Sequence, residues 1–505
     1  MFSSITLTAL KRRPEGIFLA AAVLCKQPSS SGSSRTFATG SSSSSSSGSS
    51  SSSIDPSSFQ FAAALSSDGN LYRAIDEVAE AVKQQLQGRR IDFCQLFVST
   101  AHKSNLGHAP ACLQDKLFKD VAEGSRSRPV ILGGALQSVS ANGRMISNGP
   151  GVSLLAASLP GVQLLPFHVK KPALPSFTAE QWKELLQRPS QSTDGSSSSS
   201  SSSEAQQQNA AILLSSPHFV DVEKFLLRLS AALPGMPMVG GVTERGAWVE
   251  SEHDFGALFC NQDVYAGGAV GCIMRGPLSM QQVLVPGCRT AGAVMTVTEA
   301  AGNVIFALDD RPVHDSFVTL VHSLPQQDQK RELLLGLCDP GAAAAAAGDA
   351  GSRDFVARRV SLMPTAYSRP VLVVATHEVP VGTRVRLLMR DNAFNQQQQQ
   401  AEFAALAERL PAADSRLGVL SYGCVALPLE EQPDAAACFL PQVPSAGGRM
   451  QGEFAGTLQQ PAAVLQDGSA AAAAAGAWPG VAQLHSFAAS YAILQHTSTA
   501  PSSKE

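Results

Sequence analysis

The chain has 505 residues, of which 44% are hydrophobic and 16% are charged, a balance that excludes a wholly disordered protein and supplies enough apolar material for a buried core. Its formal net charge is −3 and no basic cluster occurs after residue 53, which argues against binding of a nucleic-acid backbone. Nine cysteines without a Cys-x-x-Cys pair argue against a zinc site and against a disulfide framework.

The first 40 residues are predicted to be a transit peptide for a mitochondrion or plastid. They are rich in serine and poor in acidic residues, carry the basic group Lys11-Arg12-Arg13, and end in the arginine-containing stretch 35–39. The alternative is a secretory signal, because an apolar run at 17–24 follows the basic group. No apolar run in the chain is long enough to span a bilayer.

Runs of one residue type are predicted to be surface loops, because such sequences cannot bury enough apolar surface to order themselves. They occupy positions 41–53, 196–203, 342–347, 396–400 and 470–475. We place a serine-rich linker at 41–58, disordered insertions at 189–209, 341–352, 395–400 and 467–477, and a disordered tail at 495–505.

Three segments share one pattern: an apolar strand that ends in small residues, an intervening stretch, and a proline followed by a short strand that ends in Gly-Gly. The apolar strands are 91–100, 211–216 and 417–423, and the Gly-Gly strands are 129–134, 237–241 and 444–448. Continuous apolar strands joined by helix-length crossovers predict β-α-β units whose strands are covered on both faces. The predicted fold class is therefore α/β, with layered sheets built from repeated β-α-β units plus antiparallel hairpins.

The three glycine pairs have two interpretations. Glycine permits a positive φ or the close approach of a ligand, so the pairs can converge on one binding crevice. Alternatively, the pairs only form tight turns.

The region between the second and third units has a different pattern. Short apolar runs alternate with Gly, Asn and Asp between residues 256 and 308, which predicts antiparallel hairpins. Ala301-Gly302-Asn303 is typical of a hairpin turn. Helices are predicted at 312–320 and at 328–337.

Ten short motifs, in this hairpin region and elsewhere in the chain, match the sequence pattern of one family. They are Ile131–Ala135, Gly149–Leu155, Leu159–Gly161, Asn261–Ala269, Gly287–Arg289, Thr296–Ala300, Gly302–Ile305, Leu308–Pro312, Gly452–Gly456 and Leu484–Ala488. The combination resembles the FIST sensory domain (F-box and intracellular signal transduction), and the earliest motifs resemble its eukaryotic F-box-linked branch. The resemblance covers roughly residues 90–494 and implies a two-part architecture, with an N-terminal domain at 59–275 and a C-terminal domain at 276–494.

The resemblance implies an intracellular module that senses a small ligand such as an amino acid and passes the signal to a protein partner. It does not imply an enzyme. Two features depart from the family pattern: no F-box-like helical stretch precedes residue 90, and the third unit lacks the polar and basic residues expected after its strand at Ser421–Pro428.

Gly287-Cys288-Arg289 is the first candidate binding motif. Arg289 follows an apolar strand, where its guanidinium can hold a ligand carboxylate through two parallel hydrogen bonds. The alternative is a structural ion pair with a nearby carboxylate. Cys288 and Cys424 each lie beside a glycine near a strand end and are either reactive or buried structural thiols, and only Cys288 has a neighbouring cation in the sequence.

Glu453 is the second candidate, because its carboxylate can accept a hydrogen bond from a ligand amine, although it can equally cap a turn. Ser99, Thr100 and Glu244 are weaker candidates from the same crevice. The predicted ligand-binding residues are Gly133, Gly134, Gly240, Gly241, Thr243, Gly287, Cys288, Arg289, Ser421 and Glu453.

Common catalytic motifs are absent from the sequence, including a Gly-x-Ser-x-Gly elbow, a Walker A loop, a complete Gly-x-Gly-x-x-Gly and a His-x-x-x-His pair. His102 and His108 lack carboxylate or cysteine neighbours, and His485 is predicted to be a core histidine. We therefore expect a non-enzymatic small-molecule sensor without a metal or cofactor, acting through an unknown protein partner. The alternatives are a protein-interaction adaptor related to F-box substrate receptors, and a hydrolase or transferase that uses Cys288 or Cys424 but lacks a recognisable histidine partner.

Overall fold

A computed structural model describes most of the chain after residue 57. The described residues are 58–118, 129–170, 208–219, 222–233, 235–244, 257–338, 355–364, 369–376, 378–408, 410, 415–427, 435–456 and 482–497. All of them belong to one unit of the chain, Ile54–Glu505, and the other unit, Met1–Ser53, lies outside the described residues. The expected transit peptide and the expected low-complexity loops other than 396–400 also fall outside them.

Three successive parts of the chain repeat one order of elements: an outer strand, two inner strands, a hairpin and a return strand. The first repeat contains β1 (Gln60–Ser66), α1 (Leu71–Leu86), β2 (Phe93–Ser99), the 3-10 helix η1 (Thr100–His108), α2 (Ala109–Phe118), β3 (Val130–Leu136), β4 (Ser138–Ala141), β5 (Arg144–Ser147) and β6 (Val152–Ser158). The second contains β7 (Gln163–Val169), β8 (Gln208–Ser215), α4 (Val222–Ala232), β9 (Met238–Val242), β10 (Leu258–Cys260), β11 (Asp263–Tyr265) and β12 (Ala269–Gly276). The third contains β13 (Leu278–Pro286), α6 (Asn392–Ala407), β22 (Gly418–Cys424), α7 (Ala435–Phe439), β23 (Ser445–Met450), β24 (Gly452–Gly456), β25 (Ala482–His485) and β26 (Ala488–His496). The domain boundary expected after residue 275 stays a prediction, and residue 275 lies within β12.

Each repeat supplies most of one six-stranded sheet, and the three sheets have the same strand order. The orders are β1-β6-β2-β3-β10-β11, β7-β12-β8-β9-β24-β25 and β13-β26-β22-β23-β4-β5. The inner pairs β2–β3, β8–β9 and β22–β23 are parallel, which confirms the three β-α-β units, and all other pairs within these sheets are antiparallel. The predicted α/β class with layered sheets is confirmed.

The repeats are joined because each one donates its hairpin to a neighbour's sheet. The hairpin β4–β5 of the first repeat pairs with β23 of the third, β24–β25 of the third pairs with β9 of the second, and β10–β11 of the second pairs with β3 of the first. This cyclic exchange makes the three sheets a single interlocked structure.

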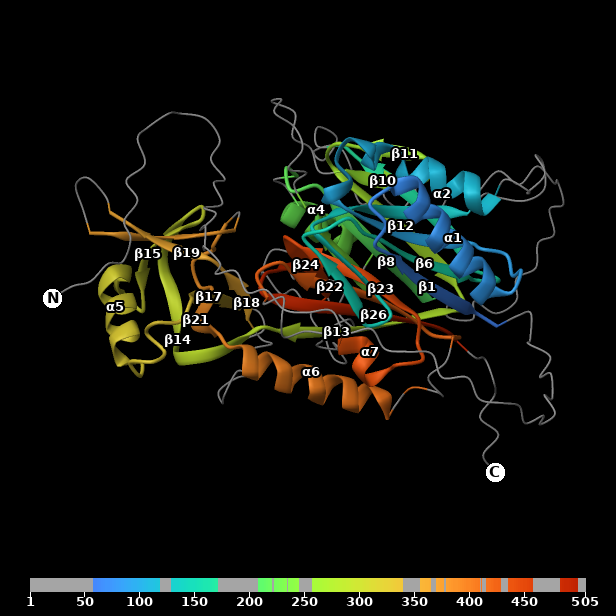
Figure 1. The fold of residues 1–505 in the computed structure, drawn as a ribbon. Coiled ribbons are helices and arrows are strands. Elements are labelled where there is room, and N and C mark those ends of the chain that lie inside the picture. The colour runs from blue at the N-terminus through green and yellow to red at the C-terminus, as the bar shows by residue number, and fades with distance from the viewer. Residues whose placement is uncertain are drawn as a thin grey trace, which may run out of the picture. The chain divides into compact units, whose positions relative to one another are not determined.

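Every sheet has an inner and an outer apolar face. Phe97, Leu214 and Tyr422 occupy equivalent positions on β2, β8 and β22, and all three lie in one shared central core. The outer faces pack on α1 and α2 in the first sheet, on α4 in the second, and on α6 and α7 in the third. Figure 1 shows α1 and α2 covering the sheet that contains β1 and β6. Burial on both faces explains the continuous apolar runs in the sequence.

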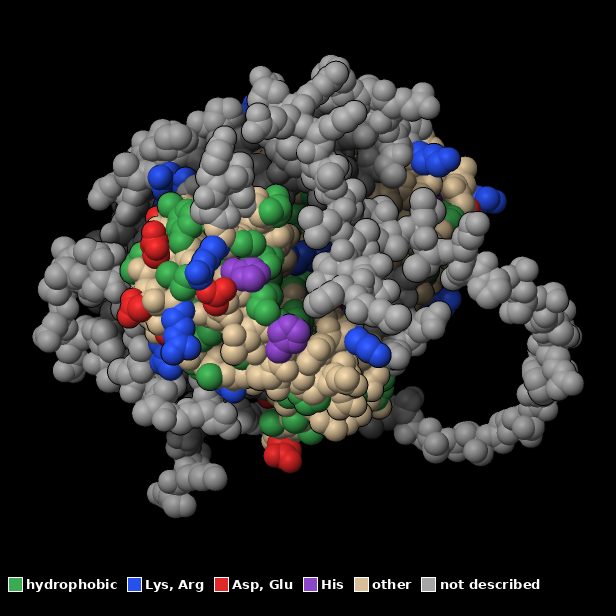
Figure 2. Space-filling model, turned by 90° about the vertical axis from the view of Figure 1, so that its left-hand side faces the viewer, with side chains coloured by type: hydrophobic (Ala, Val, Ile, Leu, Met, Phe, Trp, Pro, Cys, Tyr) green, Lys and Arg blue, Asp and Glu red, His purple; other side chains and the backbone are tan. Residues whose placement is uncertain are grey.

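A subdomain of residues 288–390, which we call the inserted subdomain, separates β13 from α6 in the third repeat. It contains β14 (Cys288–Ala301), β15 (Val304–Leu308), β16 (Arg311–Pro312), α5 (Val313–Ser323), β17 (Leu333–Cys338), β18 (Val356–Arg358), β19 (Val360–Met363), β20 (Val371–Val374) and β21 (Arg384–Arg390). Its strands form an antiparallel eight-stranded sheet, and the turn at Ala301-Gly302-Asn303 joins β14 to β15 as predicted. Figure 2 faces the left-hand side of Figure 1, where α5 and β15 lie. Basic and acidic side chains are interspersed over the coloured surface in that view.

Four predictions of local structure are wrong. Residues 328–337 are not a helix: β17 begins at Leu333 and pairs with both β21 and β18. The glutamine run 396–400 is not a loop, because it continues α6, whose Asp391 N-cap accepts a hydrogen bond from the Phe394 N–H at 3.2 Å. The strands of the Gly-Gly motifs also run beyond their glycines, since pairing with the incoming hairpins extends them. The expected tail at 495–505 starts inside β26.

None of the helices in the described ranges has the length and apolar character that a membrane span requires.

Candidate functional site

The three glycine pairs converge as one interpretation predicted, but their surroundings are filled by side chains. A Cβ at Gly133, Gly240 or Gly447 would overlap the carbonyl oxygen of the neighbouring parallel strand. The second glycine of each pair meets a side chain from the next repeat in the cycle: Thr243 at Gly134, Met450 at Gly241 and Leu136 at Gly448. The glycines therefore permit close packing of the repeats, and side chains of the described residues occupy the space beside them.

Thr243 and Ser421 share this structural environment. The Thr243 hydroxyl donates to the carbonyl of Ser215 at 3.1 Å and is fully buried. Ser421 is buried within β22, directly beside Gly447 on β23. Both side chains therefore pack where neighbouring strands meet.

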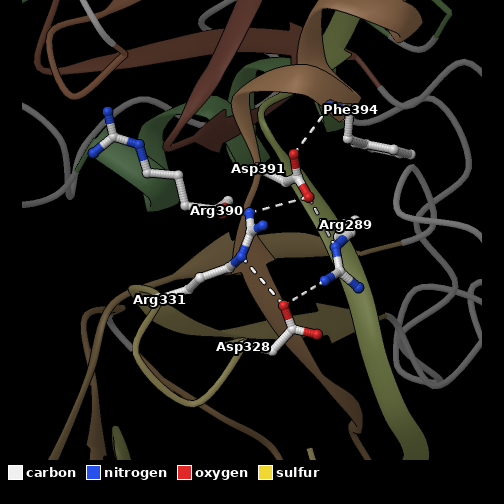
Figure 3. Close-up of polar contacts among 6 residues, drawn as sticks. All are labelled: Arg289, Asp328, Arg331, Arg390, Asp391 and Phe394. Carbon is white, nitrogen blue, oxygen red and sulfur yellow. Dashed lines mark hydrogen bonds and ion pairs between the residues drawn. The ribbon is translucent and has the colours of Figure 1, made fainter. Parts of the chain in front are cut away.

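Arg289 lies in an ion-pair network at the start of β14. Its Nε contacts Asp391 Oδ2 at 2.9 Å and its NH2 contacts Asp328 Oδ1 at 2.8 Å, while Arg331 bridges the same two carboxylates (Figure 3). The structure thus realises the ion-pair alternative. A ligand carboxylate at Arg289 would compete with two carboxylates already in place.

The ion pairs and hydrogen bonds of this network favour the charged forms of Arg289 and Asp391. The hydrogen bond to Asp328 raises the pKa of Arg289, although its partial burial works in the opposite direction. Burial opposes the ionisation of Asp391, but the N–H of Phe394 and the guanidinium groups of Arg289 and Arg331 outweigh it and lower the pKa. Because Asp391 also caps α6, the network fixes the point where the inserted subdomain returns to the third repeat.

Gly287 and Cys288 line a closed cavity of about 20 Å³ between the inserted subdomain and the repeated sheets. The Gly287 N–H donates to the Phe487 carbonyl at 2.7 Å, and a Cβ at Gly287 would overlap that oxygen. The other walls include Leu388 from the subdomain and His485 from β25. This volume accommodates about one water molecule.

His485 and Glu453 form the polar side of this region. They lie directly opposite each other on β25 and β24, so their side chains project from the same face of the sheet. Glu453 is 0% exposed and His485 is 6% exposed. In the described part of the chain, neither carboxyl oxygen of Glu453 nor Nε2 of His485 makes a well-formed hydrogen bond, although the Ala488 N–H and the Cys424 thiol face the carboxyl group. Buried polar atoms without partners are rare because each costs free energy, so a group that reaches them would be stabilised.

Burial shifts both of these groups toward their neutral forms. Complete burial raises the pKa of Glu453 well above its ordinary value, although the Ala488 N–H and the Cys424 thiol face the carboxyl group. Burial and the charge of Arg358 lower the pKa of His485 to about 3. Burial therefore favours the protonated carboxyl group of Glu453 and the neutral imidazole of His485.

The candidate thiols are buried and protonated. Burial and the Glu332 carboxylate raise the pKa of Cys288 to about 12, and burial and Glu453 raise the pKa of Cys424 to about 12. The structure brings His485 to the cavity that Cys288 lines, which supplies the histidine that the sequence did not reveal. Neither member of this cysteine–histidine pair is ionised, so it is not an activated nucleophile as it stands.

The other candidates lie elsewhere. The Ser99 hydroxyl donates to the Gly149 carbonyl at 2.6 Å, and Thr100 begins η1. Glu244 accepts from the Gln451 side chain at 2.7 Å, and His102 is buried among the elements of the first repeat. Within the described residues, no group of three or more His, Cys, Asp or Glu side chains has the arrangement to hold a metal ion.

Comparison with known proteins bears on the middle of the chain, from α2 through the closed cavity to β16. Residues 113–311 match the FIST N domain. FIST domains are sensory domains of signal transduction. The FIST N match includes Gly287, Cys288 and Arg289 and ends before Glu453 and His485, so it leaves the polar side of the cavity unassigned.

Two curated relatives come from Mycobacterium tuberculosis. The chain is 24% identical over 281 residues to the uncharacterized protein MT0656 of strain CDC 1551 and equally to the uncharacterized protein Rv0628c of strain H37Rv. The aligned part covers 55% of this chain and 64% of each relative, so the chain spans a little under two thirds of their length.

Proposed function

We propose that this protein is a non-enzymatic sensor that binds a small molecule carrying an amino group, with a free amino acid as the leading case. The observation that carries the proposal is the fully buried carboxyl group of Glu453, whose two oxygens make no well-formed hydrogen bond in the described part of the chain and face the Ala488 N–H and the weak thiol donor of Cys424. A ligand ammonium would supply both the charge and the donors that this group lacks. The FIST N match supports a sensory role.

The closed cavity lined by His485, the cross-strand neighbour of Glu453, gives the proposal its mechanism. One side of the cavity is formed by Phe355, Ala357 and Leu388 of the inserted subdomain, and the other by His485 and Phe487 of the third repeat. A volume of about 20 Å³ is too small for an amino acid, so binding would move the subdomain and so transmit the signal to a protein partner.

A thermal-shift screen of the full chain tests this proposal. Each of the twenty L-amino acids is compared with its N-acetyl derivative, in which the amine is blocked. We expect at least one free amino acid, and not its acetylated form, to raise Tm by several degrees at saturating concentration. Glu453→Leu should remove the shift, whereas Glu299→Gln, on the exposed part of β14, should keep it.

Calorimetry in buffers of different ionisation enthalpy provides a second readout. Because burial raises the pKa of Glu453, pairing with a ligand ammonium group should lower that pKa again and release protons to the buffer. If no amino acid shifts Tm, or if Glu453→Leu responds like the unmodified chain, the proposal is wrong.

The cysteine-dependent enzyme remains a second proposal, because Cys288 and His485 line one cavity. The protonated thiol and neutral imidazole weigh against it. Localisation in a mitochondrion or plastid, and the adaptor role, stay proposals from the sequence.

A further inference from the structure

The internal repeat places a second pocket at the position equivalent to the closed cavity. The closed cavity lies between the end of β13 and the turn that leads from β25 into β26. An open pocket of about 420 Å³ lies between the end of β7 and the turn that leads from β11 into β12. These are the same elements in the third and second repeats.

Strand registers confirm the equivalence. Tyr265 lies opposite Leu258 as His485 lies opposite Glu453, and Val169 pairs with Ala269 as Val285 pairs with Ala489. Counting from these pairs, Tyr265 corresponds to His485, Gly267 to Phe487, and His168 to Leu284.

Two differences open the pocket in the second repeat. Phe487 is 2% exposed and fills the third-repeat site, whereas a Cβ at Gly267 meets no atom within 4 Å. In the third repeat the inserted subdomain also supplies walls such as Phe355, whereas the described residues that line the second-repeat pocket all belong to its own repeat. The resulting volume lies in the range of small-ligand sites.

An aromatic wall and a cation line this pocket. The rings of His168 and Tyr265 are stacked, with centroids 3.6 Å apart and an interplanar angle of 24°. His168 Nε2 lies 3.2 Å from the Gly267 carbonyl, which fixes the ring and makes this nitrogen the N–H donor. The Tyr265 hydroxyl donates a hydrogen bond to the carboxylate of Asp263, with an oxygen–oxygen distance of 3.2 Å.

Lys170 supplies the positive charge. Burial lowers the pKa of His168, so this imidazole is neutral at physiological pH. The Lys170 side chain is exposed at the pocket, and it has no ion pair among the described residues. Acidic residues are absent from the described lining of the pocket.

We propose that this pocket of the second repeat binds a small organic anion in which a carboxylate is joined to a flat apolar body. The carboxylate contacts the Lys170 ammonium, and the flat body packs against the His168–Tyr265 wall in the space that Gly267 leaves open. The site is separate from Glu453 and does not depend on the proposed amino-acid response.

Titration of the full chain with benzoate, followed by saturation-transfer NMR, tests the site. Benzoate should bind saturably, while the neutral isostere benzamide should bind at least tenfold more weakly and benzylammonium should not bind. Lys170→Met should weaken benzoate binding at least tenfold, and Lys330→Met, an exposed lysine before β17, should leave it unchanged.

Gly267→Phe reproduces the residue of the closed third-repeat site and should abolish benzoate binding. If this variant does not fold, as judged by its thermal transition, Lys170→Met decides the outcome, since it changes only an exposed side chain. Absence of saturable benzoate binding, equal affinity for benzamide, or unchanged binding by Lys170→Met would overturn the inference. Glu453→Leu should bind benzoate normally, which separates this site from the proposed sensory response.

Discussion

His485 and Glu453 illustrate at the scale of single residues how burial can dominate the pKa of a side chain. Neither group meets a strong partner, and each is therefore driven to its neutral form, the histidine by a lowered pKa and the glutamate by a raised one. The sequence predicted Glu453 as a candidate but assigned His485 to the core. A histidine between apolar residues carries no signal of its cross-strand partner, because the partner is set by the register of β24 and β25.

The lowered pKa of His485 makes stability depend on pH. Above about pH 6.5 the residue is neutral in both states, whereas between pH 6.5 and 3 the unfolded chain binds a proton that the folded chain does not. Stability should therefore fall as pH falls through this window. His485→Leu should reduce that loss by up to about 1.4 kcal/mol per pH unit. Urea denaturation at pH 7.5 and pH 5.0 measures it.

The exposed His322 provides the matched control for this prediction. Because this substitution changes an exposed side chain, His322→Gln should keep the dependence of unfolding free energy on pH that the unmodified chain has. An identical pH slope in His485→Leu and the unmodified chain would show that His485 is solvated.

Burial also predicts the order in which thiols react. Cys438 is exposed and Cys112 is half-buried, whereas Cys288 and Cys424 are buried with raised pKa values. With limiting iodoacetamide at pH 7.5, Cys438 should be the first of the described thiols to be alkylated, and Cys288 and Cys424 should react only after unfolding. Peptide mass spectrometry gives the order, and early modification of Cys288 would instead favour the nucleophile hypothesis.

At the scale of elements, the glycines of the parallel pairs have a purely steric role. Gly447→Ala should destabilise the protein by about 3 kcal/mol or more, because its Cβ would overlap the Ser421 carbonyl and the backbone cannot yield cheaply. Gly69→Ala, where a Cβ meets nothing, should change stability by less than about 0.5 kcal/mol. Denaturant midpoints compare the two variants, and similar values would exclude the steric explanation.

Pairing and periodicity compete in the elements that were predicted wrongly. Residues 333–338 have the apolar content of a helix, yet β17 forms because two flanking strands, β18 and β21, satisfy its backbone. The glutamines of α6 are good helix formers once Asp391 caps the helix and Phe403 and Leu406 bury one face. The helix α1 went unpredicted although Ala74, Ile75, Val78 and Val82 follow helical spacing.

For the whole molecule, the cyclic exchange of hairpins decides which residues meet. Thr243 lies against Gly134, and Glu453 lies opposite Gly241 on the neighbouring strand. Both contacts arise because each hairpin enters another repeat's sheet. The exchange also explains why expected candidates from the three units do not form one crevice. The space where they meet is filled by the shared core.

The sequence by itself determined the α/β class, the three β-α-β units and the hairpin turn at residues 301–303, because apolar runs and turn residues act locally. Only the tertiary structure decided the ion pairs of Arg289, the isolation of Glu453 and His485, and the opening of the pocket at Gly267. These depend on which distant strands pair and where the inserted subdomain sits against the third repeat. That information lies in long-range packing, which no local pattern encodes.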